Sequence, residues 1–126
     1  MLVLDTHMVL WWGGEPRRLG RKAAPRLERA DHLGIPVIVF WEIALLIRKG
    51  RFELGLTVKR WLAAVEGIPR VEVLPLTAEI AVAADALEMH ADPADRFIVA
   101  TALHHAAPLV SKDRLMQDLR IVETIW

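Results

Sequence analysis

Four acidic residues interrupt or flank the most apolar stretches of the chain, and this placement constrains the fold more than any other feature. Burying a carboxylate beside a hydrophobic core is unfavourable unless something compensates its charge. Four carboxylates that meet at one edge of a fold also repel one another, and a divalent cation is the simplest compensation. The pattern therefore indicates metal-dependent hydrolytic chemistry. The acids are Asp5 after residues 2–4, Glu42 as the only charge within residues 37–47, Asp95 before residues 97–100, and Asp113 after residues 109–111.

Short stretches rich in Val, Ile and Leu alternate with stretches of helical periodicity, which is typical of a mainly parallel sheet covered on both faces. With 126 residues and no repeat or linker, we predict one α/β domain over residues 1–126, with a central sheet of four to five strands. The predicted strands cover residues 2–5, 37–39, 71–74, 109–111 and 121–125. The predicted helices cover residues 6–12, 18–32, 40–49, 57–66, 77–87, 95–105 and 113–119, with the second starting near Ala24 because of Pro25.

The predicted elements place the four acids at one end of the sheet. Asp5 and Asp113 end or follow strands. Glu42 falls in the first turn of the helix after the second strand, and Asp95 lies early in the helix that leads to the fourth. In parallel sheets, residues just past the carboxyl ends of the strands converge on a crevice where the strand order reverses. We therefore expect the four side chains on one rim.

Helix capping is the alternative explanation for several of these acids, because an aspartate can accept the free amide hydrogens of a first turn. It fits Asp113 well and Asp5 moderately. Asp92 is best explained as a cap, since a proline follows at the first helical position, and we assign it no catalytic role. Asp95 follows early in the same helix, where the positive end of the helix dipole favours an acid even if the residue has no catalytic role. Glu42 has no such explanation, so the joint occurrence of the acids favours a functional site.

Composition excludes several classes of protein and site. The chain has no cysteine, so a metal would have oxygen or histidine ligands. The apolar run over residues 35–47 contains Pro36 and Glu42 and is shorter than the roughly 20 residues of a membrane span. No signal peptide is visible, and we predict a cytoplasmic protein without membrane contact. Residues 1–60 carry +5 and residues 61–126 carry −5, which disfavours bulk binding of long duplex DNA but permits a local phosphodiester contact.

The histidines and tryptophans are mostly explained by packing or exposure. No histidine pair has the spacing of a metal motif, although His7 is close enough to Asp5 to line the same site. The five tryptophans are more typical of a core or an interface than of base stacking. No nucleophile elbow, Walker loop or dinucleotide fingerprint occurs. The four acids therefore remain the candidate chemistry.

Several segments together resemble the PIN domain, in particular the VapC-type toxins of bacterial toxin–antitoxin systems. These are Leu-Val-Leu-Asp-Thr-His at 2–7, Trp-Trp at 11–12, Phe-Trp-Glu-Ile-Ala at 40–44, Lys-Gly-Arg at 49–51, Asp-Pro-Ala-Asp-Arg-Phe-Ile-Val-Ala-Thr-Ala at 92–102 and Ser-Lys-Asp-Arg-Leu at 111–115. The resemblance runs nearly end to end and implies a PIN-like α/β fold. It also implies that four acids bind Mg²⁺ or Mn²⁺ and cleave RNA, which by motif are Asp5, Glu42, Asp95 and Asp113.

The resemblance further implies an endoribonuclease that cleaves single-stranded RNA and leaves 5′-phosphate and 3′-hydroxyl ends. The three aspartates would chiefly hold the metal, and Glu42 would hold metal or position the attacking water. Ser111 stands where the family has Thr or Ser near the last acid, and Thr6 belongs to the opening motif. Three basic residues flank the acids and are candidate phosphate contacts: Arg96, Lys112 and Arg114.

The same resemblance implies two protein partners, a second copy of the chain and an antitoxin. An antitoxin tail would lie over an apolar groove and reach the acidic site. The helices predicted over residues 40–49 and 57–66, with Trp61 and Leu62, are the candidate groove.

Two alternatives remain open from the residues alone. A receiver-type or haloacid-dehalogenase-type phosphoryl-transfer domain also places Asp at strand ends, and Lys112 could supply its lysine, but Glu42 is then unexplained. A non-catalytic PIN-like interaction module, in which the acids are only caps, is the second alternative.

Overall fold

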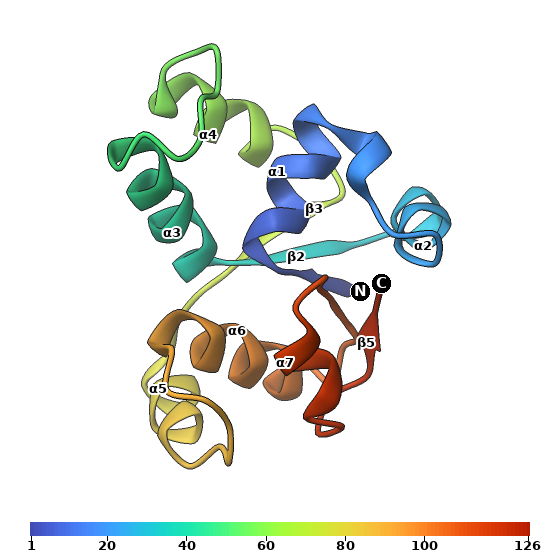
Figure 1. The fold of residues 1–126 in the computed structure, drawn as a ribbon, viewed down its shortest axis with the longest axis vertical. Helices are drawn as coiled ribbons and strands as arrows, with labels where there is room; N and C mark the ends of the chain where they lie inside the picture. Colours follow the sequence, from blue (N-terminus) through green and yellow to red (C-terminus); the bar gives the residue numbers. More distant parts are fainter.

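A five-stranded sheet forms the centre of the computed structural model, which describes all 126 residues (Figure 1). The strand order is β3-β2-β1-β4-β5, and every neighbouring pair is parallel. The predicted α/β class and parallel sheet are therefore confirmed. The strands are β1 (Leu2–Leu4), β2 (Leu33–Pro36), β3 (Val71–Leu74), β4 (Leu109–Val110) and β5 (Thr124–Ile125).

Helices lie on both faces of this sheet. In Figure 1, α1, α3 and α4 lie on one side of the strands, and α5, α6 and α7 lie on the other. The helices are α1 (Thr6–Gly14), a 3-10 turn (Pro16–Arg18), α2 (Ala23–Arg29), α3 (Val37–Arg48), α4 (Val58–Glu66), α5 (Ala78–Asp85), α6 (Pro93–His104) and α7 (Arg114–Asp118). No helix is both long enough and apolar enough to cross a membrane.

The strand order reverses between β1 and β4. From β1 the chain builds outward through β2 and β3, then returns to the opposite side of β1 to add β4 and β5. The register places Val3 beside Gly34 on one side and Leu109 on the other. The backbone N–H of Asp5 continues this ladder by donating to the carbonyl of Val110 at 3.1 Å. The carboxyl ends of β1 and β4 therefore form the crevice where a parallel sheet usually binds its ligand.

The hydrophobic core holds the elements that carry the acids. One cluster of 23 buried residues joins β1 to the inner faces of α1, α3 and α6. Val39 and Ile43 anchor α3 in it, and Ile98 and Val99 anchor α6. Each such side chain contributes on the order of 1.5–3 kcal/mol by leaving water. Because these helices are fixed by their apolar faces, the acids on them have little freedom to move apart.

The strand predicted over residues 37–39 was wrong, because the second strand is Leu33–Pro36 and residue 37 begins α3. Pairing with both β1 and β3 holds Leu33–Pro36 in the middle of the sheet. Gly34 packs closely there, since an added Cβ would lie 2.6 Å from Leu74 Cδ1 and would displace that side chain. Glu42 consequently lies in the second turn of α3 rather than in the first turn of its helix.

Helix starts were predicted more accurately than the second strand. The side chain of Asp92 caps α6 as expected, and Thr77 caps α5, each by accepting from amides of the first turn. Asp113 likewise caps α7, with Oδ1 accepting from Leu115 N at 2.7 Å. The helix predicted over residues 18–32 is shortened to Ala23–Arg29, which places Pro25 in its first turn. Asp5 also caps α1 by accepting from Thr6 N, so capping operates at all three aspartates for which it was considered, and two of these, Asp5 and Asp113, are among the four acids.

Candidate active site

Asp5 is the buried centre of the acidic site. It directly follows β1, and only 5% of its surface is exposed. Its Oδ1 accepts a 2.6 Å hydrogen bond from Thr6 N, and its Oδ2 accepts a 2.7 Å bond from Ser111 Oγ. Burial raises the pKa of this carboxyl above its usual value, although the two hydrogen bonds oppose the shift. Asp5 is therefore a carboxylate that the fold holds rigidly at an energetically unfavourable position.

Ser111 connects the ends of the two central strands. Its side chain is fully buried, and besides donating to Asp5 it accepts a 3.0 Å hydrogen bond from Asp113 N. A single hydroxyl therefore fixes the first acid relative to the backbone that carries the last acid. The resemblance places Ser111 near the last acid of the family, and the structure places its hydroxyl between the Asp5 carboxylate and the Asp113 amide.

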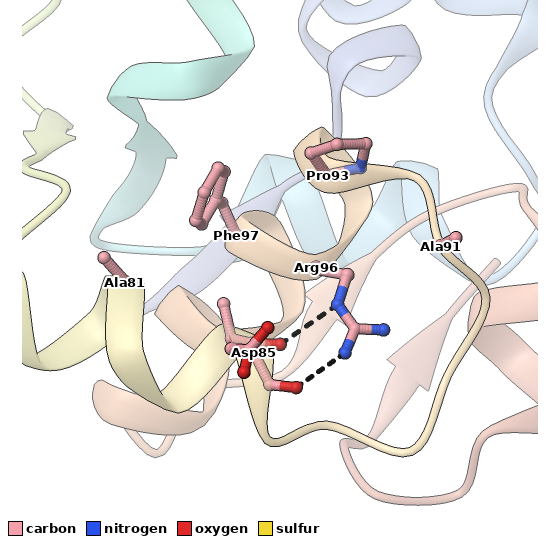
Figure 2. A pocket seen from close by; sticks show the side chains of 7 residues that line it. Ala81, Asp85, Ala91, Pro93, Arg96 and Phe97 are labelled. Atoms are coloured by element: carbon pink, nitrogen blue, oxygen red, sulfur yellow. Dashed lines mark hydrogen bonds between the residues drawn. The ribbon is translucent and has the colours of Figure 1, made fainter.

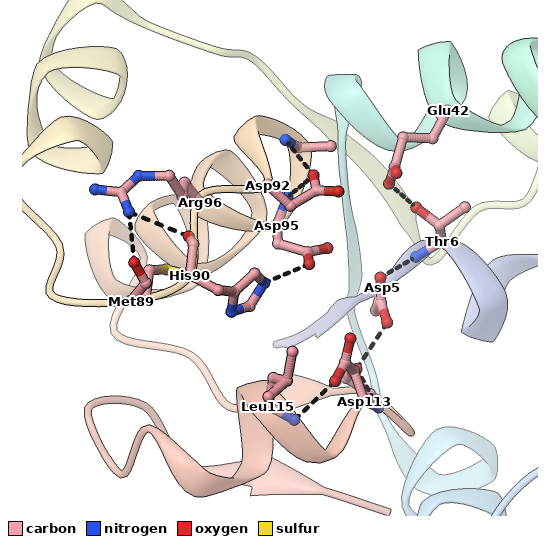
Figure 3. A network of polar contacts seen from close by, with 12 residues as sticks. Asp5, Thr6, Glu42, Met89, His90, Asp92, Asp95, Arg96, Asp113 and Leu115 are labelled. Atoms are coloured by element: carbon pink, nitrogen blue, oxygen red, sulfur yellow. Dashed lines mark hydrogen bonds and ion pairs between the residues drawn. The ribbon is translucent and has the colours of Figure 1, made fainter.

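Glu42 reaches the same region from α3. The hydroxyl of Thr6 donates a short hydrogen bond to Glu42 Oε2, so the residue after Asp5 also orients the glutamate (Figure 3). Burial raises the pKa of Glu42 to about 7, and the negative charges of Asp5, Asp95 and Asp92 add to this shift. The raised pKa of Glu42 reflects its surroundings, in which other acids lie nearby and no Lys or Arg forms an ion pair with it.

Asp95 lies in the first turn of α6. Its Oδ2 lies 2.6 Å from His90 Nε2, which is the one ion pair that any of the four acids makes (Figure 3). Burial raises the pKa of Asp95 to about 6, with Asp92 and Asp5 adding and the bond to His90 opposing. The pKa shifts at Asp5, Glu42 and Asp95 have the same main cause, namely burial, and neighbouring like charges add to each.

The four acids share one cavity of about 330 Å³, as expected from their positions past the strands. Figure 3 shows Asp5, Glu42, Asp95 and Asp113 converging from four different elements. Seven of its eight lining residues are polar, a composition suited to ionic chemistry rather than to an apolar ligand. The lining residues are Asp5, Thr6, His7, Glu42, Leu46, Asp95, Lys112 and Asp113.

Two groups on the rim of the cavity, Lys112 and His7, carry or can acquire positive charge. Lys112 Nζ lies over the ring of Trp11, 4.6 Å from its centroid, and Arg18 lies 4.5 Å from the same centroid. Burial lowers the pKa of His7, and the charge of Lys112 lowers it further. His7 is thus disfavoured as a counter-ion to the acids, which leaves Lys112 as the fixed positive charge beside the cavity.

A larger cavity of about 500 Å³ lies between α5 and α6 but offers no comparable chemistry (Figure 2). Its lining is mostly small and apolar, and Figure 2 shows the Arg96 guanidinium turned toward backbone carbonyls of α5. The acidic cavity is therefore the better candidate despite its smaller volume.

The donor set of the acidic cavity fits a hard divalent cation, because carboxylate oxygens from four residues face it and no Lys or Arg pairs with them. As the side chains lie, no three Asp, Glu or His residues form a group that could hold a metal ion. The carboxylates are instead turned toward donors of the protein, which are Thr6, Ser111, His90 and the amide of Leu115. Metal binding would therefore require carboxyl rotations within the cavity.

Comparison with known proteins identifies the family. The family model for the PIN domain matches residues 2–122. The chain belongs to the PIN domain family. This PIN domain is 38% identical to Ribonuclease VapC22 of Mycobacterium tuberculosis over 99% of its own length and 98% of that protein, so the VapC-type resemblance is also confirmed.

Solved structures share the fold of this PIN domain along its whole length. A toxin–antitoxin complex from Klebsiella pneumoniae aligns with a TM-score of 0.71 at 19% identity, over 100% of this chain and 97% of that one. The Mycobacterium tuberculosis toxin VapC20, described as cleaving the sarcin-ricin loop, aligns with a TM-score of 0.69 at 18% identity over all of both chains. Membership of the PIN family removes the receiver-type and dehalogenase-type alternative.

The structure gives the candidate phosphate contacts of this PIN domain different surroundings. Lys112 and Arg114 are exposed beside the acids. Arg96, in contrast, turns away from the cavity, and its guanidinium donates to five backbone carbonyls. A guanidinium has five N–H groups, so Arg96 retains none for a phosphate. Its surroundings are those of a structural residue, and only the other two remain candidates for RNA contact.

His90 is the contact that reasoning from the sequence missed. The sequence predicts a surface or packing role for most of the histidines, His90 included, because no histidine pair has the spacing of a metal motif. The loop between α5 and α6 brings its ring to Asp95. The one available signal was the position of His90, which shares a loop with the capping Asp92 before an acid-bearing helix.

Proposed function

We propose that this protein is a Mg²⁺- or Mn²⁺-dependent endoribonuclease that cleaves single-stranded RNA, and that it is the toxin of a toxin–antitoxin pair. The observation that carries the proposal is the convergence of Asp5, Glu42, Asp95 and Asp113 on one polar cavity at the carboxyl ends of β1 and β4. The relative of 38% identity, which is named a ribonuclease, supports the substrate class.

The residues that line the cavity would have different roles. Asp5, Asp95 and Asp113 would hold the cation, which when bound polarises the phosphodiester and lowers the pKa of the attacking water. Thr6 and Ser111 hold Glu42 and Asp5 at the cavity by hydrogen bonds, which limits the reorganisation that these two side chains need to a rotation of the carboxyl group. Glu42 has a pKa of about 7 without metal, and it would either join the ligands or orient the water and accept its proton.

Lys112 is the residue we assign to the RNA phosphate. Its ammonium group is held over the Trp11 ring at the edge of the cavity and forms no ion pair with a protein carboxylate. A cation that is already positioned loses little side-chain freedom when a phosphate arrives. Arg114 is exposed at the start of α7 and extends the same basic edge. Zero net charge on the chain agrees with contact over a short stretch of RNA.

The proposed partners are an antitoxin and a second copy of the chain. The structural neighbours include complexes described as toxin–antitoxin assemblies. A cavity of about 480 Å³ beside α1 and α4 is lined in part by Phe52, Leu54 and Trp61, and Trp61 also packs on Phe40 of α3. Half of its ten lining residues are hydrophobic and none lies in α3, so it supports only the α4 side of the groove predicted at α3 and α4. Val37 and Trp41, both exposed on α3, support a further apolar contact such as that of a homodimer.

The deciding test is Asp5→Asn in a cleavage assay on single-stranded RNA with Mg²⁺ or Mn²⁺. The amide keeps one acceptor oxygen for Thr6 N and can donate from its NH2 group to Ser111 Oγ, but it carries no charge. We therefore expect a loss of at least about 100-fold in rate with the fold preserved. Asp118→Asn is the matched control, because Asp118 is exposed at the end of α7. Full cleavage by Asp5→Asn, or cleavage by the wild type that persists in EDTA, would refute the proposal.

A further inference from the structure

One guanidinium organises the loop between α5 and α6. Arg96, in the second turn of α6, reaches back across this loop with all five of its N–H groups. A side chain that donates to so many carbonyls holds the backbone between them in one conformation. The acceptors, at distances of 2.8–3.2 Å, are the carbonyl oxygens of Ala84, Asp85, Leu87, Met89 and His90.

The same loop is fixed at its other end by a helix cap. Asp92 Oδ1 accepts from Ala94 N at 3.0 Å and from Asp95 N at 3.4 Å. His90 lies between the Arg96 contacts and this cap, so its backbone is restrained on both sides. Its ring points at Asp95, with 2.6 Å between Nε2 and Oδ2 (Figure 3). Both side chains are largely covered, with 23% of His90 and 19% of Asp95 exposed.

We propose that His90 is a positioning residue for Asp95, holding one carboxylate oxygen by an Nε2–H donor so that the carboxylate presents its other oxygen to the cation. This inference rests on the proposed metal-dependent function. It assigns His90 no direct contact with metal or RNA, and His90 does not line the acidic cavity.

The chemistry of the contact determines which atom donates. An ionised carboxylate can only accept hydrogen bonds, so His90 Nε2 must carry the proton that is shared with Asp95. Asp5 and Glu42 have equivalent donors, which are Ser111 and Thr6. His90 therefore completes a pattern in which three of the four acids are each held by one side-chain donor. Removal of such an outer partner typically weakens metal binding by about 10- to 100-fold.

The test compares Mn²⁺ binding, measured by calorimetry and by the loss of the free-ion electron paramagnetic resonance signal, in the wild type and three His90 variants. His90→Ala removes the ring, His90→Phe keeps an aromatic ring without a donor, and His90→Gln restores an N–H donor on a flexible chain. We expect Ala and Phe each to weaken Mn²⁺ binding at least about 10-fold and Gln to recover most of it. If His90 only packed against its neighbours, His90→Phe would bind Mn²⁺ more tightly than His90→Gln.

His104→Ala is the matched control, because it removes an exposed imidazole from the far end of the same helix. Thermal unfolding in EDTA reports whether each variant folds. Unchanged or tighter Mn²⁺ binding in both His90→Ala and His90→Phe would overturn the positioning role while leaving the proposed function intact. The positioning role would also be overturned if His90→Gln bound Mn²⁺ no more tightly than His90→Phe. Absence of Mn²⁺ binding in the wild type would instead refute the proposed function, and the role of His90 with it.

Discussion

Ser111 Oγ donates a 2.7 Å hydrogen bond to Asp5 Oδ2, although the two residues are 106 positions apart in the chain. They meet because β1 and β4 are neighbours at the point where the strand order reverses. The same hydroxyl accepts from Asp113 N, so one buried atom links the first and last acids of the site. The acidic cavity is therefore built into the centre of the sheet rather than assembled from mobile loops.

Ser111→Ala should destabilise the protein by about 1–3 kcal/mol at neutral pH, because a buried carboxylate loses a hydrogen-bond donor. Urea unfolding monitored by tryptophan fluorescence measures the loss. Ser111→Thr retains the hydroxyl and should lose less. If Ser111→Ala equals the wild type, the bond to Asp5 contributes no net stability.

Stability of the metal-free protein should depend on pH through the raised carboxyl pKa values. Glu42 shifts from 4.5 to about 7 and Asp95 from 3.8 to about 6 on folding. A raised carboxyl pKa means that the unfolded chain ionises first, so each group lowers stability as pH rises from its unfolded value to its folded one. These two acids should therefore make the fold less stable at pH 8 than at pH 5. His7, whose pKa is lowered, acts in the opposite direction.

Glu42→Gln isolates one of these contributions. The amide cannot ionise, so the variant should melt several degrees above the wild type at pH 8 in EDTA and show little difference at pH 5. Thermal unfolding at both pH values measures this. Glu66→Gln is the control, because Glu66 is exposed at the end of α4. An equal gain for Glu42→Gln at both pH values would show that the effect is not the ionisation of this carboxyl.

Divalent cations should stabilise the folded protein by relieving repulsion in the cavity. A ligand at 100 times its dissociation constant adds about 2.7 kcal/mol if it binds only the folded state. We expect the melting temperature to rise as Mg²⁺ or Mn²⁺ is titrated, and to return to its starting value with EDTA. Asp5→Asn should show a much smaller rise. An equal rise in both proteins would place the cation elsewhere.

Arg96→Gln should be among the most destabilising substitutions of a partly exposed residue, because five carbonyl contacts are lost together. We expect about 3 kcal/mol or more by urea unfolding, with hydrogen exchange speeding up over residues 85–92. Arg29→Gln is the matched control, since it removes an exposed arginine from the end of α2. Weakened RNA binding with unchanged stability in Arg96→Gln would show instead that Arg96 contacts phosphate.

Lys112→Ala should raise KM for single-stranded RNA by about 10-fold and change kcat less, because a phosphate contact made before the reaction contributes chiefly to binding. Steady-state cleavage of a short fluorescent RNA measures both constants. Lys59→Ala is the control, because Lys59 is exposed on α4. A loss confined to kcat would place Lys112 in the reaction step instead.

The sequence alone determined the class of the fold and pointed to the four acids that share the cavity, because both depend on local patterns. Apolar runs alternating with amphipathic stretches predict a parallel α/β sheet wherever the pairing falls. Asp92 before Pro93 and Thr77 before α5 cap their helices through contacts within four residues, so no tertiary information was needed. Glu42 stood out because a charge within an apolar run must have a compensating partner.

Only the tertiary structure decided which strand lies where and which contacts the site residues make. Val37–Val39 has the composition of a strand but is helical, because the sheet pairs Leu33–Pro36 and the close approach at Gly34 is visible only in three dimensions. Arg96 beside Asp95 suggested a phosphate contact, and the fold directs it to five carbonyls instead. The hydrogen bond from Ser111 to Asp5 depends on the pairing of β1 with β4, and the contact of His90 with Asp95 depends on the path of the loop between α5 and α6. Local propensities encode neither.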